Sequence, residues 1–444
     1  MRIMPYLAIK SRFLFSGTER DGVFFEKMMK NNWKKVKLGD ILEKIIGGGT
    51  PSRVVADFWN GDIFWATVKD MKDGVYKLSE TQERITEQGV KSSATNIISK
   101  NTVIISTRMG LGRCFINKVE MAINQDLKAL IPNKNVDVNF LLWLLVSKTK
   151  EIEVMGTGTT VKGIRLEELR NIEIIIPERI EDQKKIAEIL SGYDDLIENN
   201  NRRIKILEEM AQAIYKQWFV DFKFPGYEKV KMVDSSAGEA GGELGSMPEG
   251  WEIKRIEDVI ETIGGGTPSK EKVEYWNSGA IQWFTPTDLT SNKQAFIFQS
   301  SLKINELGLK KSSAKLFPAF SVMMTSRATI GEISINIKPA STNQGFITCI
   351  PNEFVSVYQL YFWLKENKDL IISLSGGATF KEINKSTFRN LLITVPELET
   401  RRTFMDAIEP IFSQMKNIQL KNNNLRKTRD LLLPKLMNGL NLDL

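Results

Sequence analysis

The sequence predicts an α+β fold in which two similar mixed α and β domains are joined by two long antiparallel coiled-coil helices with pseudo-two-fold symmetry. Two observations support this prediction. Most loop motifs of the first half return about 218 residues later, and each half ends in a long run of regularly spaced apolar residues. The chain of 444 residues is also too long for a single hydrophobic core, so we expect at least two domains.

The two long helices are predicted from apolar seams that recur in alternating steps of four and three residues. The seam that starts at Ile186 is repeated from Phe404 (404 − 186 = 218). A period of 3.5 residues over this length is typical of helices that pack along each other. The central seam positions are Tyr193, Ile197, Asn200, Ile204 and Leu207 in the first helix, and Ile411, Met415, Ile418, Asn422 and Leu425 in the second.

Internal symmetry favours an antiparallel arrangement of these helices, because a two-fold axis perpendicular to the seam reverses one of them. Pairing positions whose numbers sum to 622 places Asn200 opposite Asn422 and Tyr193 opposite Arg429. Two buried amides that satisfy each other would fix the register at some cost in stability. The alternative is that each asparagine lies at a solvated or frayed point.

A break is expected near the start of each long helix. Gly192 and Pro410 occupy equivalent positions (410 − 192 = 218), and both residue types disfavour a helix interior. We therefore expect a short helix, a break, and a long helix that begins near Tyr193 or Ile411. The long helix of the first half would then measure about 40 Å at 1.5 Å per residue.

The two globular domains are predicted from a tandem duplication of loop motifs that keep the same order. Short β-rich runs alternate with helical runs and with Gly- and Ser-rich loops in each copy, which is typical of a compact mixed domain. The main repeated motifs are Ile-Gly-Gly-Gly-Thr-Pro-Ser at 46–52 and 263–269, Trp-Asn at 59–60 and 276–277, Thr107-Arg108 and Ser326-Arg327, and Asn124-Gln125 and Asn343-Gln344.

Composition and repeats divide the chain into six segments. Residues 225–250 are rich in glycine and acidic side chains, cannot bury a core, and are predicted to form a flexible linker. The leader at 1–30 precedes the first well-patterned segment, and we expect it to be disordered or dispensable. The other segments are a first globular domain at 31–177, a first long helix region at 178–224, a second globular domain at 251–396 and a second long helix region at 397–440.

The composition argues against several classes of enzyme. The chain has no histidine and only two cysteines, which excludes Ser-His-Asp and Cys-His catalysis and His- or Cys-rich zinc sites. The cysteines are predicted to be buried reduced thiols in a cytoplasmic protein, and no apolar run approaches the roughly 18 residues of a membrane span. Lys and Arg number 61 against 54 Asp and Glu, and the net charge of +7 permits a polyanion partner without requiring one.

Candidate DNA-binding side chains lie in the repeated loops. Arg108 and Arg327 each follow a β run and precede a Gly-containing turn, where a guanidinium could reach a phosphate or a guanine, or instead form a packed salt bridge. The full candidate set is Thr50, Ser52, Arg53, Lys69, Arg108 and Lys162 in the first half, and Thr267, Ser269, Lys270, Thr287, Arg327 and Lys381 in the second.

Several repeated motifs have a structural alternative. The glycine-rich loops resemble phosphate cradles, but they lack the Gly-Lys-Ser/Thr ending of a nucleotide-binding loop, so a structural turn is the other interpretation. The Asn-Gln pairs could read adenine or could order a loop. The repeated Trp59 and Trp276 are predicted to be core residues. No methyltransferase or nuclease motif accompanies the repeated Asp70 and Asp288.

The complete arrangement resembles the specificity subunit of type I restriction-modification systems. The resemblance covers residues 33 to 440 and rests on the duplicated Gly-Gly-Gly-Thr-Pro-Ser segment with its Trp-Asn, the two arginine loops and the two Asn-Gln pairs. It also rests on Trp218-Phe219-Val220-Asp221-Phe222-Lys223-Phe224-Pro225-Gly226 at the end of the first helix and on Met247-Pro248-Glu249-Gly250-Trp251 at the start of the second half.

This resemblance implies that each half is a target recognition domain reading one part of a split double-stranded DNA sequence. It implies that the helices set the spacer and dock methyltransferase subunits, two in number, and that restriction and translocase subunits join the complex. It also implies that this chain is not catalytic and binds no cofactor, with S-adenosylmethionine, ATP and Mg²⁺ on partner subunits. The alternative function is a structural coiled-coil scaffold without base-specific recognition.

Overall fold

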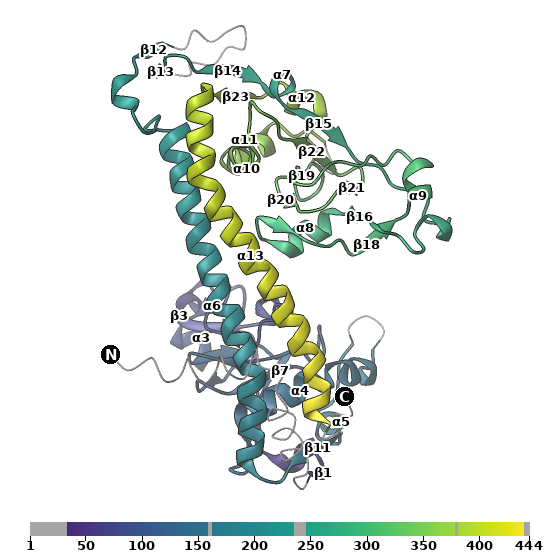
Figure 1. Ribbon diagram of the computed structural model, residues 1–444. Helices are drawn as coiled ribbons and strands as arrows, with labels where there is room; N and C mark the ends of the chain where they lie inside the picture. The colour runs from purple at the N-terminus through teal and green to yellow at the C-terminus, as the bar shows by residue number, and fades with distance from the viewer. Residues whose placement is uncertain (1–32, 159–161, 235–245, 378–380, 439–444) are drawn as a thin grey trace. The chain divides into compact units, whose positions relative to one another are not determined.

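The computed structural model describes residues 33–158, 162–234, 246–377 and 381–438 (Figure 1). The predicted leader at 1–30 lies outside these ranges. Contacts divide the chain into two compact units, residues 1–200 with 421–444, and residues 201–420. Each unit therefore combines one of the two duplicated globular domains with a segment of both long helices.

The first unit is built around a five-stranded sheet of order β2-β10-β7-β8-β4 and a four-stranded sheet of order β5-β3-β9-β6. The central strands β7 (Val103–Ser106) and β8 (Cys114–Asn117) are buried along their whole length and pack against α4 (Val138–Met155). Other elements are β1 (Trp33–Lys37), η1 (Leu38–Ile41), β2 (Leu42–Gly47), η2 (Ala56–Phe58), β3 (Trp59–Ala66), η3 (Val68–Asp70), β4 (Lys77–Leu78), β5 (Glu83–Ile85), α3 (Glu87–Lys91), β6 (Ile97–Ile98), β9 (Met121–Ile123), β10 (Leu127–Pro132), α5 (Leu166–Arg170) and β11 (Glu173–Pro177).

The second unit repeats this topology, with a five-stranded sheet of order β15-β22-β19-β20-β17 and a three-stranded sheet of order β18-β16-β21. Its buried central strand β19 (Val322–Thr325) pairs antiparallel with both neighbours, as β7 does. The other elements are β14 (Glu252–Arg255), α7 (Ile256–Val259), β15 (Glu261–Gly264), η5 (Val273–Tyr275), β16 (Ile281–Phe284), α8 (Pro286–Asn292), β17 (Phe296–Ile297), β18 (Leu302–Ile304), α9 (Glu306–Lys310), β20 (Ile333–Asn336), β21 (Ala340–Thr342), β22 (Phe346–Ile350), α10 (Val357–Glu366), α11 (Lys368–Ser373), α12 (Lys385–Arg389) and β23 (Leu392–Val395). The predicted α+β fold with a tandem duplication is confirmed.

Each long helix is continuous, so the predicted break is wrong. Helix α6 spans Ile180–Phe219 and α13 spans Leu398–Met437, each with 40 residues, or about 60 Å at 1.5 Å per residue. Pro410 is exposed, so water can solvate the carbonyl that its missing N–H leaves unpaired. A glycine at position 192 costs only about 1 kcal/mol in a helix, which packing outweighs. None of the helices within the described ranges is long and apolar enough to cross a membrane.

The helices pair antiparallel in each unit, as predicted. In the first unit, Asn200 Nδ2 donates a hydrogen bond to Asn422 Oδ1 at 2.8 Å. In the second unit, the rings of Trp218 and Phe404 lie 5.6 Å apart. Both pairs sum to 622, which confirms the predicted register. Of the predicted seam residues, Tyr193, Ile197, Ile204, Met415, Ile418 and Asn422 are buried, and Asn200, Leu207, Ile411 and Leu425 are partly buried.

Equivalent layers of the helical pair use different chemistry in the two units. In the first, Arg429 forms an ion pair with Asp194, is 3% exposed, and lies 5.0 Å from the Tyr76 ring. In the second, the position equivalent to Asp194 is Phe412, which stacks on Tyr358 at 4.1 Å. The symmetric backbone therefore accepts either a buried ion pair or an aromatic cluster.

The predicted flexible linker at 225–250 is partly wrong. Its described residues form η4 (Tyr227–Lys229) and a two-stranded pair, β12 (Met232–Asp234) with β13 (Ser246–Pro248). Flanking residues Phe224 and Trp251 are buried, with stacked rings 5.2 Å apart. These aromatic residues supply the apolar area that the rest of the segment lacks. Residues 235–245 lie outside the described ranges.

The asparagine pair can be tested by mutation. Asn422→Leu removes the hydrogen bond of the Asn200 amide, and we expect a loss of about 1–3 kcal/mol in the free energy of unfolding. The double variant Asn200→Leu/Asn422→Leu should recover part of this loss, because both polar groups are then gone. Urea unfolding followed by tryptophan fluorescence measures both effects. A single variant as stable as the wild type would contradict this role.

A pH dependence follows from the buried ion pair. Burial raises the pKa of Asp194 to about 6, against the opposing effect of Arg429. The unfolded carboxyl titrates near 3.9, so the folded state binds more protons between these values and loses stability as the pH rises. Relative to Asp194→Asn, the wild type should lose about 1 kcal/mol of unfolding free energy from pH 5 to pH 7. Parallel stability curves for the two proteins would refute this.

Candidate nucleic-acid interface

In both units the arginine loop is joined to the loop that carries the candidate lysine. Ile164 N donates to Thr107 O at 3.0 Å, and Ile383 N donates to Ser326 O at 3.1 Å. Single β-bridges also connect Arg108 with Gly163 and Arg327 with Glu382. Each arginine therefore lies beside the residue that follows the candidate lysine, Lys162 or Lys381. Both lysines are exposed.

A left-handed turn follows each arginine. Met109 has φ 53° and Ala328 has φ 59°, a conformation that non-glycine residues rarely adopt. The Ser106 hydroxyl donates to Arg108 O at 2.5 Å and helps to hold the first turn. The same backbone reversal at equivalent positions indicates that the turn serves to project the arginine.

The Asn-Gln pairs have divided roles. The Asn124 side chain bonds to Asp126 within its own turn, accepting from its N–H at 3.1 Å and donating to its carboxylate at 3.2 Å. Asn343 accepts from Gly345 N at 2.9 Å in the same way. The asparagines therefore order the turn, which is the structural alternative considered above. The glutamines Gln125 and Gln344 are exposed and accept hydrogen bonds from the hydroxyls of Thr50 and Thr267.

The repeated glycines are structural and do not form a phosphate cradle. A Cβ on Gly48 would lie 2.0 Å from Ile123 O, and one on Gly265 would lie 2.1 Å from Asn343 O. Gly49 N donates to Ile123 O at 3.0 Å, and Gly266 N to Thr342 O at 2.9 Å, so these amides are already engaged. The glycines allow the loop to pack against the end of the neighbouring strand and the Asn-Gln turn.

The tryptophans brace the same loops. Trp59 Nε1 donates to Ser52 O and Trp276 Nε1 to Ser269 O, each at 3.0 Å. Each of these rings meets a fully buried tryptophan edge-on, at 5.2 Å in the first unit and 5.1 Å in the second. Their packing agrees with the predicted core role, and it leaves the Ser52 and Ser269 side chains exposed.

Arg53 and Lys270 occupy equivalent positions but differ in environment. The Arg53 guanidinium lies 3.8 Å from the centre of the Trp59 ring and pairs with Glu83, whose pKa is lowered by this hydrogen bond. Lys270 is exposed in the second unit. Contact with DNA at Arg53 would thus compete with an existing salt bridge, whereas the Lys270 ammonium faces solvent.

The repeated aspartates are helix caps. Asp70 accepts from Thr67 N and Gln82 N, each at 2.8 Å. Asp288 accepts from Thr285 N at 2.7 Å and Ser301 N at 2.9 Å. Because both oxygens of each carboxylate bind backbone amides, these residues hold a turn in place. The adjacent candidates Lys69 and Thr287 are exposed, and within the described ranges no group of His, Cys, Asp and Glu could hold a metal ion.

These contacts gather the candidate residues of each unit into one surface, which we call the recognition loops. The loops comprise the glycine-rich loop, the capped turn, the Asn-Gln turn, the arginine loop and the lysine loop. A Cβ on Gly110 would lie 3.6 Å from Val68, which places the arginine loop beside the capped turn. Pro286 and Gly345 make the corresponding approach in the second unit. Segments up to a hundred residues apart in sequence therefore meet in each unit.

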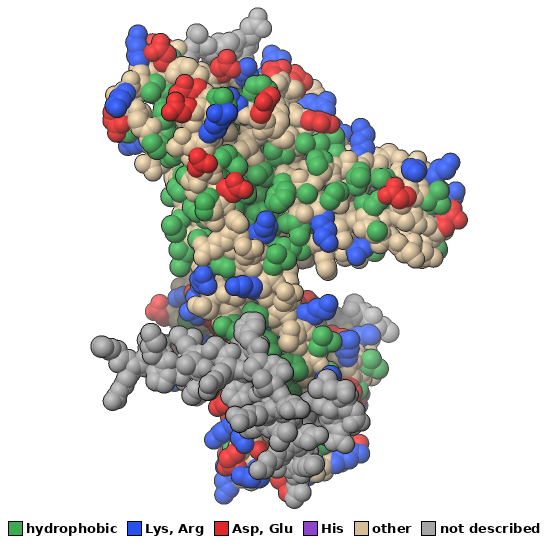
Figure 2. Space-filling view, viewed as in Figure 1, with side chains coloured by type: hydrophobic (Ala, Val, Ile, Leu, Met, Phe, Trp, Pro, Cys, Tyr) green, Lys and Arg blue, Asp and Glu red, His purple; other side chains and the backbone are tan. Residues whose placement is uncertain are grey.

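Charge is dispersed around the second unit. On the face seen in Figure 2, Lys and Arg side chains are interspersed with acidic and hydrophobic ones and do not form one continuous basic field. Individual placed cations are therefore a better basis for DNA recognition than net charge.

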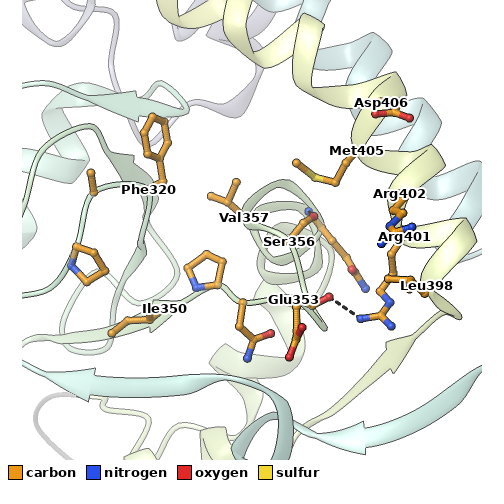
Figure 3. A pocket seen from close by; sticks show the side chains of 15 residues that line it. Phe320, Ile350, Glu353, Ser356, Val357, Leu398, Arg401, Arg402, Met405 and Asp406 are labelled. Atoms are coloured by element: carbon orange, nitrogen blue, oxygen red, sulfur yellow. Dashed lines mark hydrogen bonds between the residues drawn. The ribbon is translucent and has the colours of Figure 1, made fainter.

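A cavity of about 470 Å³ in the second unit lies apart from the candidate residues (Figure 3). Its lining includes Phe320, Ile350, Val357 and Met405, and Arg401 donates to Glu353 O at 2.5 Å beside it. None of the candidate DNA-binding residues lines it. It is a mainly apolar hollow between the sheet end and α13.

Sequence reasoning missed the acidic partners of the two arginines. Arg108 Nη1 lies 3.8 Å from Asp126 Oδ1, and Arg327 Nε lies 2.6 Å from Glu382 Oε1. The arginines are repeated in the sequence, but their partners are not at equivalent positions, so comparison of the two halves gave no signal for them.

The fold and its duplicated loops define a protein with two similar recognition domains and a shared pair of long helices. Residues 30–209 and 248–427 match the family described as the type I restriction modification DNA specificity domain. The chain is 30% identical to the type I restriction enzyme MjaIX specificity subunit of Methanocaldococcus jannaschii, over 92% of this chain and 93% of that protein. It is 27% identical to the HindI specificity subunit of Haemophilus influenzae, over 92% and 99%.

A crystal structure of the type I restriction-modification S subunit from M. genitalium has the same fold, with a TM-score of 0.55 and 16% identity over 93% of this chain and 98% of that one. The chain belongs to the family of type I restriction-modification DNA specificity proteins. Its function is DNA sequence specificity within such a system.

The packing of the glycine-rich loop can be tested with Gly48→Ala. The added Cβ would meet backbone carbonyls at 2.0 and 2.4 Å, so we expect a loss of about 1–3 kcal/mol or more in unfolding free energy. Gly192→Ala is the matched control, because a Cβ there meets nothing within 4 Å. It should stabilise α6 by up to about 1 kcal/mol. Equal effects of the two substitutions in thermal or urea unfolding would disprove the packing argument.

Proposed function

We propose that each unit reads one part of a split DNA sequence through its recognition loops, with exposed cations on the backbone and the arginines near base edges. The observation that supports this most directly is that the same loops, with an arginine and a lysine side by side, occur once in each unit. The loops differ in detail, for example in Met109-Gly110-Leu111 against Ala328-Thr329-Ile330. The two half-sites should therefore differ in sequence.

We further propose that the paired helices set the unread spacer and dock two methyltransferase subunits, with restriction and translocase subunits completing the complex. The chemistry would reside in those partners, which would bind S-adenosylmethionine, ATP and Mg²⁺. In support, the repeated Asp70 and Asp288 cap backbone amides and are not available to a substrate. The alternative is a scaffold without base recognition, which leaves the duplicated cationic loops unexplained.

Arginine substitutions separate these possibilities. Arg108→Ala and Arg327→Ala should each weaken binding to one half-site only, by about 1–3 kcal/mol, because each removes one guanidinium from one reading surface. Arg255→Ala is the control, since this exposed arginine on β14 lies outside the recognition loops. Binding of the assembled complex to DNA with one half-site mutated measures the effect. A scaffold would show no half-site dependence.

The most informative experiment is a genome-wide map of methylated bases in cells that express this chain with its cognate methyltransferase, compared with cells that lack it. Two short defined blocks around an unspecified spacer would support the proposal and would give both half-sites. A contiguous motif would mean that only one unit reads DNA. If no motif appears and the purified complex binds no DNA selectively, the scaffold is the better account.

A further inference from the structure

The arginine in each set of recognition loops has a carboxylate partner, although both arginines are about half exposed. The side chain of Arg108 is 55% exposed and lies 3.8 Å from the Asp126 carboxylate. The side chain of Arg327 is 50% exposed and lies 2.6 Å from the Glu382 carboxylate. Each arginine therefore faces solvent with its charge already compensated by a neighbour.

The two carboxylates come from different loops. Asp126 belongs to the Asn-Gln turn, where the second unit has Gly345, and Glu382 belongs to the lysine loop, where the first unit has Gly163. Neither acid is thus part of the duplicated motif. Both units nevertheless have an acid beside the arginine, which indicates that the pair itself is required and not one particular residue.

Both acids are anchored by their own loops. Asn124 holds the Asp126 side chain and amide, and Thr107 N donates to Asp126 O at 2.8 Å. Glu382 N donates to Gly376 O at 2.8 Å, and Gly376 N returns a hydrogen bond to Glu382 O at 3.1 Å. The carboxylate is therefore the fixed member of each pair, and it sets the direction in which the guanidinium can point.

A fixed carboxylate changes what the arginine can bind. A phosphate that approaches such a pair is attracted by the guanidinium and repelled by the carboxylate, so most of the net attraction is lost. The O6 and N7 acceptors of guanine carry no formal charge and suffer little repulsion. A guanidinium has five N–H donors, and when Nε binds Glu382 the terminal nitrogens remain for a two-pronged contact.

We propose that Glu382 is a specificity-determining residue that positions Arg327 to read a guanine edge and turns it away from phosphate, and that Asp126 does the same for Arg108 from the opposite side. This inference rests on the proposed reading of one half-site by each unit. Backbone attraction would then come from the exposed lysines Lys162 and Lys381. Because the two guanidinium groups are held from different loops, they should reach guanines at different places in the two half-sites.

The test uses the assembled complex with both half-sites, and it measures affinity at several salt concentrations on the intact site and on sites with single guanines replaced. Glu382→Gln should raise binding to unrelated DNA and steepen the logarithmic salt dependence by about one. It should also reduce discrimination at one guanine of a single half-site about tenfold. Glu382→Asp, which keeps the charge, should retain part of that discrimination.

Two cation variants separate base reading from backbone binding. Arg327→Ala should lose discrimination at the same guanine with little change in salt dependence, because the contact is to a base. Lys381→Ala should instead weaken binding to all sequences alike and lower the salt slope by about one. If Arg327→Ala behaves like Lys381→Ala, or if Glu382→Gln leaves guanine discrimination unchanged, the inference is wrong.

A rescue in the first unit excludes a merely structural effect. A Cβ on Gly163 would lie 3.5 Å from Arg108 Cγ, which is ordinary van der Waals contact. Asp126→Asn should lose discrimination in the other half-site, and Asp126→Asn/Gly163→Glu should restore it by supplying the acid from the lysine loop. No rescue in a folded double variant would overturn the proposal. A wild-type complex without any DNA selectivity would overturn the proposed function itself.

Discussion

The antiparallel pairing of α6 and α13 is the constraint on which both units depend. The core of the first unit contains Ile186 and Leu190 from α6 and Leu436 from α13, and the core of the second contains Trp218 and Phe404 from the same two helices. Each core is therefore completed by a segment from the far end of the chain. The free energy of these contacts is apolar burial, at about 25 cal/mol per Å² removed from water.

The pairing is specified by a few polar groups within an apolar seam. The Asn200–Asn422 hydrogen bond fixes which residues face each other, because a shifted helix would bury an amide without its partner. The buried Arg429 adds a second requirement, since it needs the Asp194 carboxylate of the facing helix. In the second unit Phe412 fills the corresponding layer with rings. Duplication has thus preserved the backbone arrangement while the side chains that hold it have diverged.

The recognition loops show the same separation between frame and surface. Repeated glycines, asparagines, aspartates and tryptophans are used inside the loops, where they satisfy backbone groups or allow close packing. The groups that remain exposed are cations and short polar side chains, and these differ between the units, as Arg53 and Lys270 do. A protein built in this way can change what it reads without changing its fold, because loop surfaces tolerate substitutions that packed positions do not.

The sequence by itself determined the duplication, the two long helices and their register. These features are periodic and local, and a seam repeated every 3.5 residues fixes its own partner when both strands of the seam are present. It also placed the arginine loops, whose DNA contacts remain a prediction. It failed at Gly192 and Pro410, because helix propensity is a weak local preference that packing over forty residues overrides. Only the tertiary structure showed which repeated residues are buried caps and which acid faces each arginine. Those facts depend on side chains that meet through folding from distant loops, and no spacing in the chain records such a meeting.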